Sequence, residues 1–68
     1  MISYKPLWRL LLDRDMKKMD LVEKLGISRA TLAKMSKCEH VALSVIERIC
    51  CELDCRIEDV VEIKKDPS

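Results

Sequence analysis

Four cysteines and one histidine are the side chains in this chain that could bind a metal ion or act as nucleophiles. They are Cys38, Cys50, Cys51, Cys55 and His40. The cysteines lack the paired C-x-x-C spacing of structural zinc sites. A disulfide framework would require an oxidising compartment. We therefore expect Cys50 and Cys55 to act as small buried hydrophobic residues. A metal site and a redox switch remain open as alternatives.

The arrangement of these residues in the sequence does not indicate an enzyme. A Ser/His/Asp set would have to use His40, and the chain contains no glycine-rich phosphate loop. A reactive pair of Cys38 and His40 would need a shielded pocket, whereas their surroundings in the sequence are typical of a surface loop. We predict that the chain is not an enzyme, with no cofactor, no metal and no small-molecule ligand.

The only glycine, Gly26, separates two short apolar stripes. The stripes consist of Leu21 and Leu25 before the glycine and of Leu32 and Met35 after it. Glycine adopts a positive φ without steric cost, so it can end the first helix, and Ser28 can then cap the second. Two helices joined by such a turn form a helix-turn-helix, whose second helix fits the major groove of DNA. The sequence predicts this motif at about residues 18–36.

Length and composition favour a single domain of packed helices over residues 1–68. Hydrophobic residues make up 49% of the chain, with one Gly and two Pro. We predict an all-α fold, a compact bundle of about five short helices. They are expected at about 6–14, 18–25, 29–36, 43–53 and 57–61. Leu12 and Trp8 are expected to widen the apolar face of the first helix. Ser44 is the polar candidate for the cap of the fourth helix, and the alternative is a start one or two residues earlier.

The two ends of the chain allow an alternative to the all-helical prediction. Residues 2–4 and 61–63 both alternate apolar and polar side chains. They could pair as a small two-stranded ribbon, within one chain or between two chains. Such a ribbon is marginally stable without other contacts.

Charge is distributed unevenly along the sequence, although the net charge is only +1. Residues 1–37 carry nine basic and four acidic side chains, a balance of +5, whereas residues 38–68 carry four basic and eight acidic ones, a balance of −4. The predicted motif lies in the basic half, which favours contact with phosphates. No apolar run is longer than the three residues of 10–12, which is too short to cross a bilayer, and we see no signal peptide. We predict a cytoplasmic protein.

Residues 18–61, about two-thirds of the chain, resemble the Cro/C1-type helix-turn-helix family, also called the Xre family. The matching residues are Leu21, Leu25-Gly26-Ile27-Ser28, Leu32, Met35, Ile46, Ile49, Leu53 and Asp59-Val60. The resemblance implies a lambda-repressor-like DNA-binding fold and a short, single-domain transcriptional regulator. Two positions depart from the family pattern. Val22 stands where alanine is usual, which implies looser packing between the motif helices, and Lys18 stands where glutamine or serine is usual.

The early residues of a recognition helix face the bases. We therefore predict base contacts from Arg29, Ala30, Thr31 and Lys34. Arg29 is suited to two hydrogen bonds with guanine, and Ala30 and the Thr31 methyl group to contact with a thymine methyl. We predict phosphate contacts from Lys18, Ser28 and Lys37. The alternative for the charged residues is a solvated helix face, and for Ser28 a purely structural cap.

The predicted partner is double-stranded DNA, bound by a homodimer. One recognition helix contacts few base pairs, so specificity favours two copies on adjacent half-sites. The alternative is a protein–protein adaptor that keeps the helix-turn-helix scaffold without binding DNA, because a fold does not determine a function.

Overall fold

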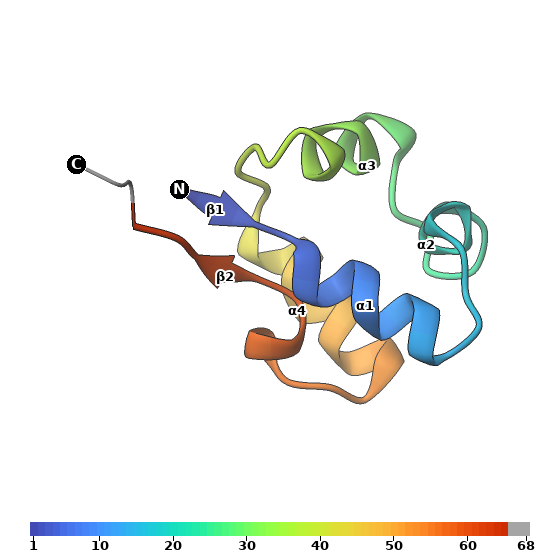
Figure 1. Ribbon diagram of the computed structural model, residues 1–68. Helices are drawn as coiled ribbons and strands as arrows, with labels where there is room; N and C mark the ends of the chain where they lie inside the picture. Colours follow the sequence, from blue (N-terminus) through green and yellow to red (C-terminus); the bar gives the residue numbers. More distant parts are fainter. Residues whose placement is uncertain (66–68) are drawn as a thin grey trace.

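The computed structural model describes residues 1–65; the predicted domain's last residues, 66–68, lie outside the described part. Within residues 1–65 the chain forms four α-helices, one 3₁₀ helix and a two-stranded antiparallel ribbon (Figure 1). The elements are β1 (Ile2–Ser3), α1 (Lys5–Asp13), α2 (Lys18–Glu23), α3 (Arg29–Ser36), α4 (Leu43–Leu53), η1 (Ile57–Asp59) and β2 (Glu62–Ile63).

A predominantly aliphatic core joins these elements. Its buried residues are Tyr4, Leu7, Leu11, Leu21, Leu25, Ile27, Met35, Ile46, Ile49, Leu53 and Val60. They come from the residue before α1, from the four α-helices, from the turn after α2 and from the residue after η1, so each α-helix directs one side inward. Of the two residues that form the apolar stripe of α3, Met35 is fully buried and Leu32 is half-buried against the core.

The turn between α2 and α3 depends on the backbone conformation of Gly26. Its φ is +75°, in the left-handed region. A Cβ atom built there would come no closer than 4.0 Å to the guanidinium nitrogens of Arg48, which is ordinary contact. The positive φ, and not a lack of space, is therefore what favours glycine here. The backbone N–H of Gly26 donates to the carbonyl of Val22 at 3.2 Å, and that of Ile27 donates to the carbonyl of Leu21 at 3.0 Å.

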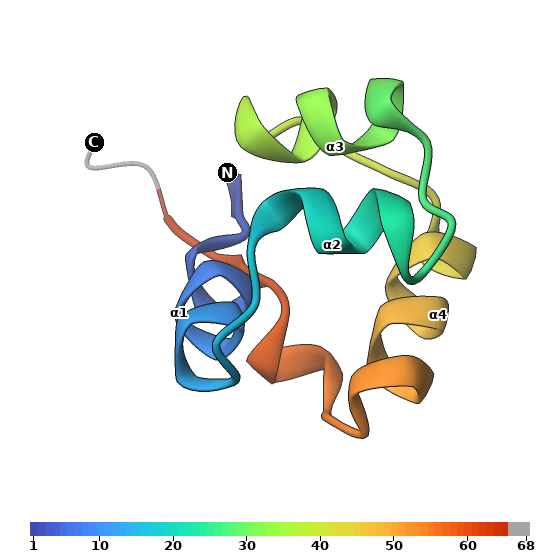
Figure 2. The same cartoon turned by 90° about the vertical axis from the view of Figure 1, so that its right-hand side faces the viewer.

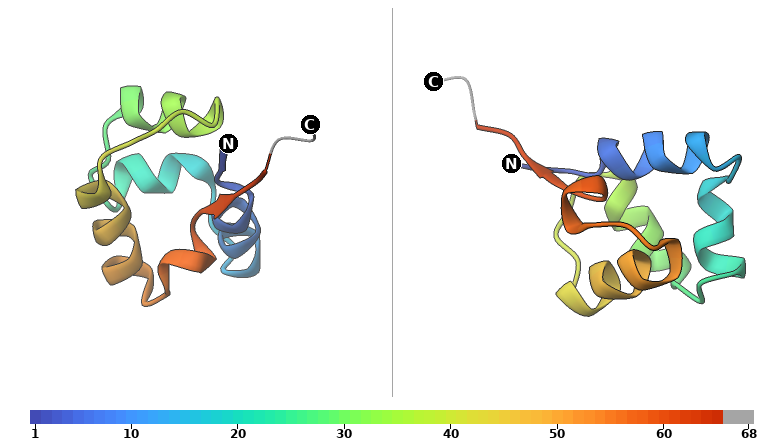
Figure 3. Two further views of the ribbon diagram at one scale, coloured as in Figure 1. Left: turned by 90° about the vertical axis from the view of Figure 1, so that its left-hand side faces the viewer. Right: turned by 90° about the horizontal axis from the view of Figure 1, so that it is seen from below.

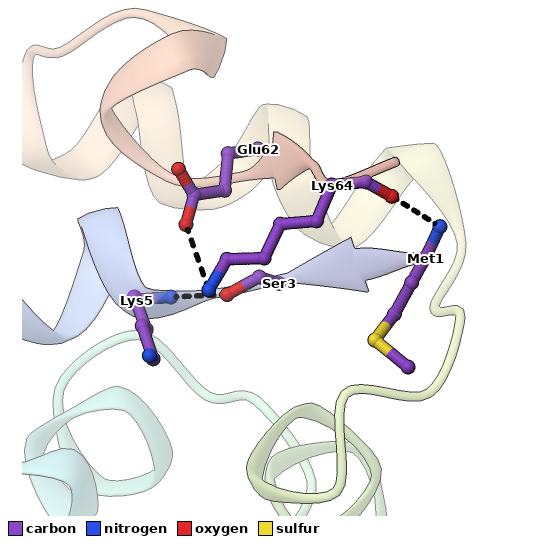
Figure 4. A network of polar contacts seen from close by, with 5 residues as sticks. All are labelled: Met1, Ser3, Lys5, Glu62 and Lys64. Carbon is purple, nitrogen blue, oxygen red and sulfur yellow. Dashed lines mark hydrogen bonds and ion pairs between the residues drawn. The ribbon is translucent and has the colours of Figure 1, made fainter. Parts of the chain in front are cut away.

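The ribbon pairs the two ends of one chain, which confirms the alternative that the sequence left open. Ile2 faces Ile63 and Ser3 faces Glu62. The Met1 amine donates to the Lys64 carbonyl at 2.8 Å (Figure 4). The Lys64 N–H donates in turn to the Met1 carbonyl at 2.7 Å. These bonds extend the pairing by one residue beyond the two strands.

The predicted fifth helix is wrong in type and length. In place of an α-helix at about 57–61, η1 is a three-residue 3₁₀ helix that lies between α1 and the end of α4 (Figure 3). The carboxylate of Asp59 accepts a hydrogen bond from the N–H of Arg56 at 3.1 Å, which caps this single turn. The helix ends there because Val60 enters the core and the chain then extends into β2.

Two smaller expectations are also wrong. Leu12 is 77% exposed, because the buried side of α1 is formed by Leu7 and Leu11. Ser44 does not cap α4: the N-cap is Ala42, which has no side chain able to accept a hydrogen bond, so the earlier start that the sequence left open is the one observed. Among residues 1–65, no helix is long and apolar enough to cross a membrane.

Candidate nucleic-acid interface

A side-chain cap determines where α3 begins. Ser28 has an extended backbone, with φ −68° and ψ 152°, and its Oγ accepts a hydrogen bond from the N–H of Thr31 at 3.1 Å. The same hydroxyl donates to Thr31 Oγ1 at 2.8 Å. This is the cap that the sequence predicted. It makes Arg29 the first residue of the helix.

The outward face of α3 carries three of the predicted contact residues, Ala30, Lys34 and Lys37. Ala30, Ala33, Lys34 and Lys37 follow one another at i, i+3, i+4 and i+7, and all four are exposed. Met35, on the opposite side, is fully buried. α3 lies along one edge of the molecule, with α2 and the core on its inner side (Figure 2). The side chains of this stripe therefore extend away from the protein.

The predicted base-contacting residues differ in their access to this face. Arg29, Ala30 and Lys34 are exposed, whereas Thr31 is half-buried and its hydroxyl already accepts the bond from Ser28. Thr31 is thus the most enclosed of the four. Arg29, in the first turn, extends from the end of the helix nearest the Gly26 turn.

The positive charge of α3 is not neutralised by neighbouring carboxylates. Within the part of the chain that the structure describes, the one ion pair joins Lys64 to Glu62, with Nζ and Oε1 3.9 Å apart. Arg29, Lys34 and Lys37 therefore make no ion pair with any residue in 1–65. A polyanion that approached α3 would not have to break an existing pair.

Lys18 lies on a different element from the other predicted contacts. It is the first residue of α2, which packs against α3. Its Nζ lies 4.3 Å from the centroid of the Trp8 ring, within the range of a cation–π interaction. Nothing in the sequence pattern indicated this contact, since Trp8 and Lys18 belong to separate predicted helices.

Arg48 is a basic residue near the candidate site that sequence reasoning missed. It is an exposed residue of α4, and its guanidinium lies beside the Gly26 turn that leads into α3. It belongs to the acidic half of the sequence, and only the packing of α4 against the motif brings it close. It adds a positive charge next to the turn before the helix.

The segment after α3 is tied to the start of the chain. The hydroxyl of the buried Tyr4 donates to the carbonyl of Glu39 at 2.7 Å. Burial of the ring raises the pKa of the Tyr4 hydroxyl. Lys37 is the C-cap residue of α3. It therefore lies between the helix on one side and, on the other, a segment that the hydrogen bond from Tyr4 holds in place.

The cysteines lie away from α3, with the exception of Cys38 in the segment that follows it. Cys38 and Cys51 are exposed, whereas Cys50 and Cys55 are half-buried against the core, not fully buried as expected. Burial raises the pKa of the Cys55 thiol to about 11, and the neighbouring Cys50 adds to the rise. Over residues 1–65 no group of three or more His, Cys, Asp and Glu side chains is placed to hold a metal ion.

Comparison with known proteins places this geometry in a family. The profile of the Cro/C1-type helix-turn-helix DNA-binding domain matches residues 6–66. The structure is similar to the crystal structure of the transcriptional regulator VanUg, with a TM-score of 0.91 and 46% sequence identity. That alignment covers 96% of this chain and 87% of the other. No curated protein matched the sequence.

Proposed function

The chain belongs to the Cro/C1-type helix-turn-helix DNA-binding family, and we propose that it regulates transcription by binding a specific DNA sequence with α3 in the major groove. The observation that carries this proposal is the outward face of α3: exposed, basic, free of ion pairs with residues 1–65, and fixed by the Ser28 cap. A match to a regulator of known structure supports the same function.

Within this proposal the side chains of α3 divide by the chemistry they offer. Arg29 provides the planar donor pair that matches O6 and N7 of guanine, and Lys34 a less directional donor one turn later. Ala30 and the Thr31 methyl group are suited to a thymine methyl. Lys37 and Lys18 provide positive charge for backbone phosphates. Ser28 caps the start of α3 with its hydroxyl, and its backbone at the helix start is suited to a phosphate contact.

We further propose that two copies bind together. A single α3 contacts too few base pairs to select one site among genomic competitors. Two copies related by a twofold axis would read half-sites about 34 Å apart, one turn of the DNA helix. The pairing would then give the operator an inverted-repeat symmetry.

The test starts with selection of binding sites from a random DNA library. Fluorescence anisotropy on the selected duplex and on a scrambled duplex, at several salt concentrations, should give tight binding to the first and a weaker, strongly salt-dependent binding to the second. Sedimentation with and without the selected DNA measures the stoichiometry. Tight, specific binding of one copy to a single half-site would contradict the dimer. An absence of salt-dependent binding to any duplex would favour the adaptor function.

A further inference from the structure

Trp8 is a large aromatic residue that the core does not fully enclose. It extends from α1, is half-buried, and packs against the edge of the core. Beside it is a shallow apolar hollow of about 280 Å³. The hollow is lined by Trp8, Leu11, Leu12, Met16, Lys17 and Lys18. The Lys18 ammonium lies over the ring, with its Nζ 4.3 Å from the ring centroid.

This contact leaves the ammonium available to a second ligand. A cation over an aromatic ring is held on one side only, and an ammonium has three N–H donors. Lys18 is exposed and makes no hydrogen bond or ion pair through its side chain with any residue in 1–65. The Lys18 ammonium therefore keeps its positive charge, and the Trp8 ring restricts its position without neutralising it.

We propose that Trp8 is a positioning residue for DNA binding: its ring holds the Lys18 ammonium in the place where it meets a backbone phosphate. This inference rests on the proposed function and adds to it a residue that touches no DNA. A free lysine side chain must lose several rotatable degrees of freedom when it meets a phosphate. A ring that already restricts those freedoms lowers the entropic cost of the contact.

The proposal predicts different effects on DNA binding for substitutions of Trp8 and of Lys18. In Trp8→Leu the lysine keeps its charge but loses its fixed position, so affinity for DNA should fall about two- to five-fold at each salt concentration. The slope of log affinity against log salt should change little. In Lys18→Met the phosphate contact is lost, and the slope should decrease by about 0.9.

The decisive experiment is a double-mutant cycle with Trp8→Leu, Lys18→Met and the double variant, assayed on the selected duplex across a salt series. If Trp8 acts through Lys18, the Trp8 substitution should have no effect on affinity once Lys18 is methionine. Trp8→Phe should retain part of the affinity, because phenylalanine keeps a weaker π face. Leu12→Ala, which lines the same hollow without a ring, should bind as the parent does.

A readout on the free protein keeps the proposal open to refutation even where a variant is less stable. In the parent, NMR signals of the Lys18 ε-CH₂ protons should be shifted upfield by the ring current of Trp8, and this shift should disappear in Trp8→Leu. An absent upfield shift in the folded parent would overturn the proposal. So would an equal loss of affinity from Trp8→Leu in the parent and in the Lys18→Met background, since that indicates a purely structural role. If the parent shows no salt-dependent DNA binding, the proposed function itself fails, whatever the NMR result.

Discussion

Ser28 and Thr31 bind each other twice at the start of α3. The Ser28 hydroxyl accepts from the Thr31 backbone N–H at 3.1 Å and donates to the Thr31 hydroxyl at 2.8 Å. The first bond satisfies one of the N–H groups that a helix start leaves without a partner. The second fixes the direction of the Ser28 hydroxyl. The pair therefore determines both where α3 begins and how its first turn is oriented.

Replacing Ser28 by alanine should lower the free energy of unfolding by about 1 kcal/mol, because the Thr31 N–H loses its acceptor. Urea denaturation of the two proteins measures this difference. Ser28→Asp is the matched control, since a carboxylate can accept the same bond and should restore most of the stability. Equal stability of Ser28→Ala and the parent would show that water replaces the cap without cost.

The Gly26 turn allows a test of backbone conformation that is separate from packing. Gly26→Ala should destabilise the fold by about 1–2 kcal/mol, because an alanine at φ +75° is strained. Thermal or urea unfolding measures the loss. Gly26→Asn should cost less, since asparagine tolerates the left-handed region better than other residues with a Cβ atom. A loss as large for asparagine as for alanine would point to crowding against Arg48, despite the 4.0 Å distance.

Local signals in the sequence were sufficient to predict α2 and α3 of the motif and the bounds of α4. α3 begins at Arg29 because Ser28 caps it, and α2 is closed by the positive φ of Gly26. The broad apolar stripe of α4 predicted its bounds, Leu43–Leu53, although not its cap. These features depend on residues close together in the chain, so periodicity and capping rules predict them.

Features that depend on packing between distant segments were not predictable in the same way. Nothing near Leu12 indicates that the core lies on the other side of α1, and nothing near Val60 indicates that η1 stops after one turn. The cation–π contact of Lys18 with Trp8, and the position of the Arg48 guanidinium beside the turn, both depend on packing between separate elements. Alternation at both ends suggested the ribbon, but only the fold shows that the two strands belong to one chain.

Substitutions on α3 should separate sequence recognition from general attraction to DNA. Arg29→Ala should cost about 1–3 kcal/mol on the selected duplex and relax the preference at one base pair per half-site. Lys37→Ala should weaken binding to selected and scrambled duplexes alike and reduce the salt slope by about one unit. Both residues are exposed, so both variants should melt close to the parent.

The assay is a set of anisotropy titrations on the selected duplex, the scrambled duplex and single-base variants of the selected one. Ser36→Ala, an exposed residue of α3 outside the predicted contacts, is a control for nonspecific effects on the helix. If Arg29→Ala lowers both affinities equally, Arg29 binds a phosphate and α3 is rotated in the groove relative to the proposal.

Stability at alkaline pH should depend on Cys55. Burial raises the pKa of its thiol from 9.0 to about 11. Between these values the unfolded chain releases the thiol proton while the folded protein keeps it, so ionisation favours the unfolded state. The protonated thiol contributes its full share to stability below pH 9. The free energy of unfolding should therefore fall as pH rises from about 9 to about 11.

Urea denaturation at half-unit pH steps should show a weaker fall of the free energy of unfolding for Cys55→Ala than for the parent. Cys51→Ala, which removes an exposed thiol and keeps Cys55, should retain the parental dependence. The same fall in Cys55→Ala as in the parent would assign the effect to another group, such as the buried Tyr4, whose pKa is also raised by burial.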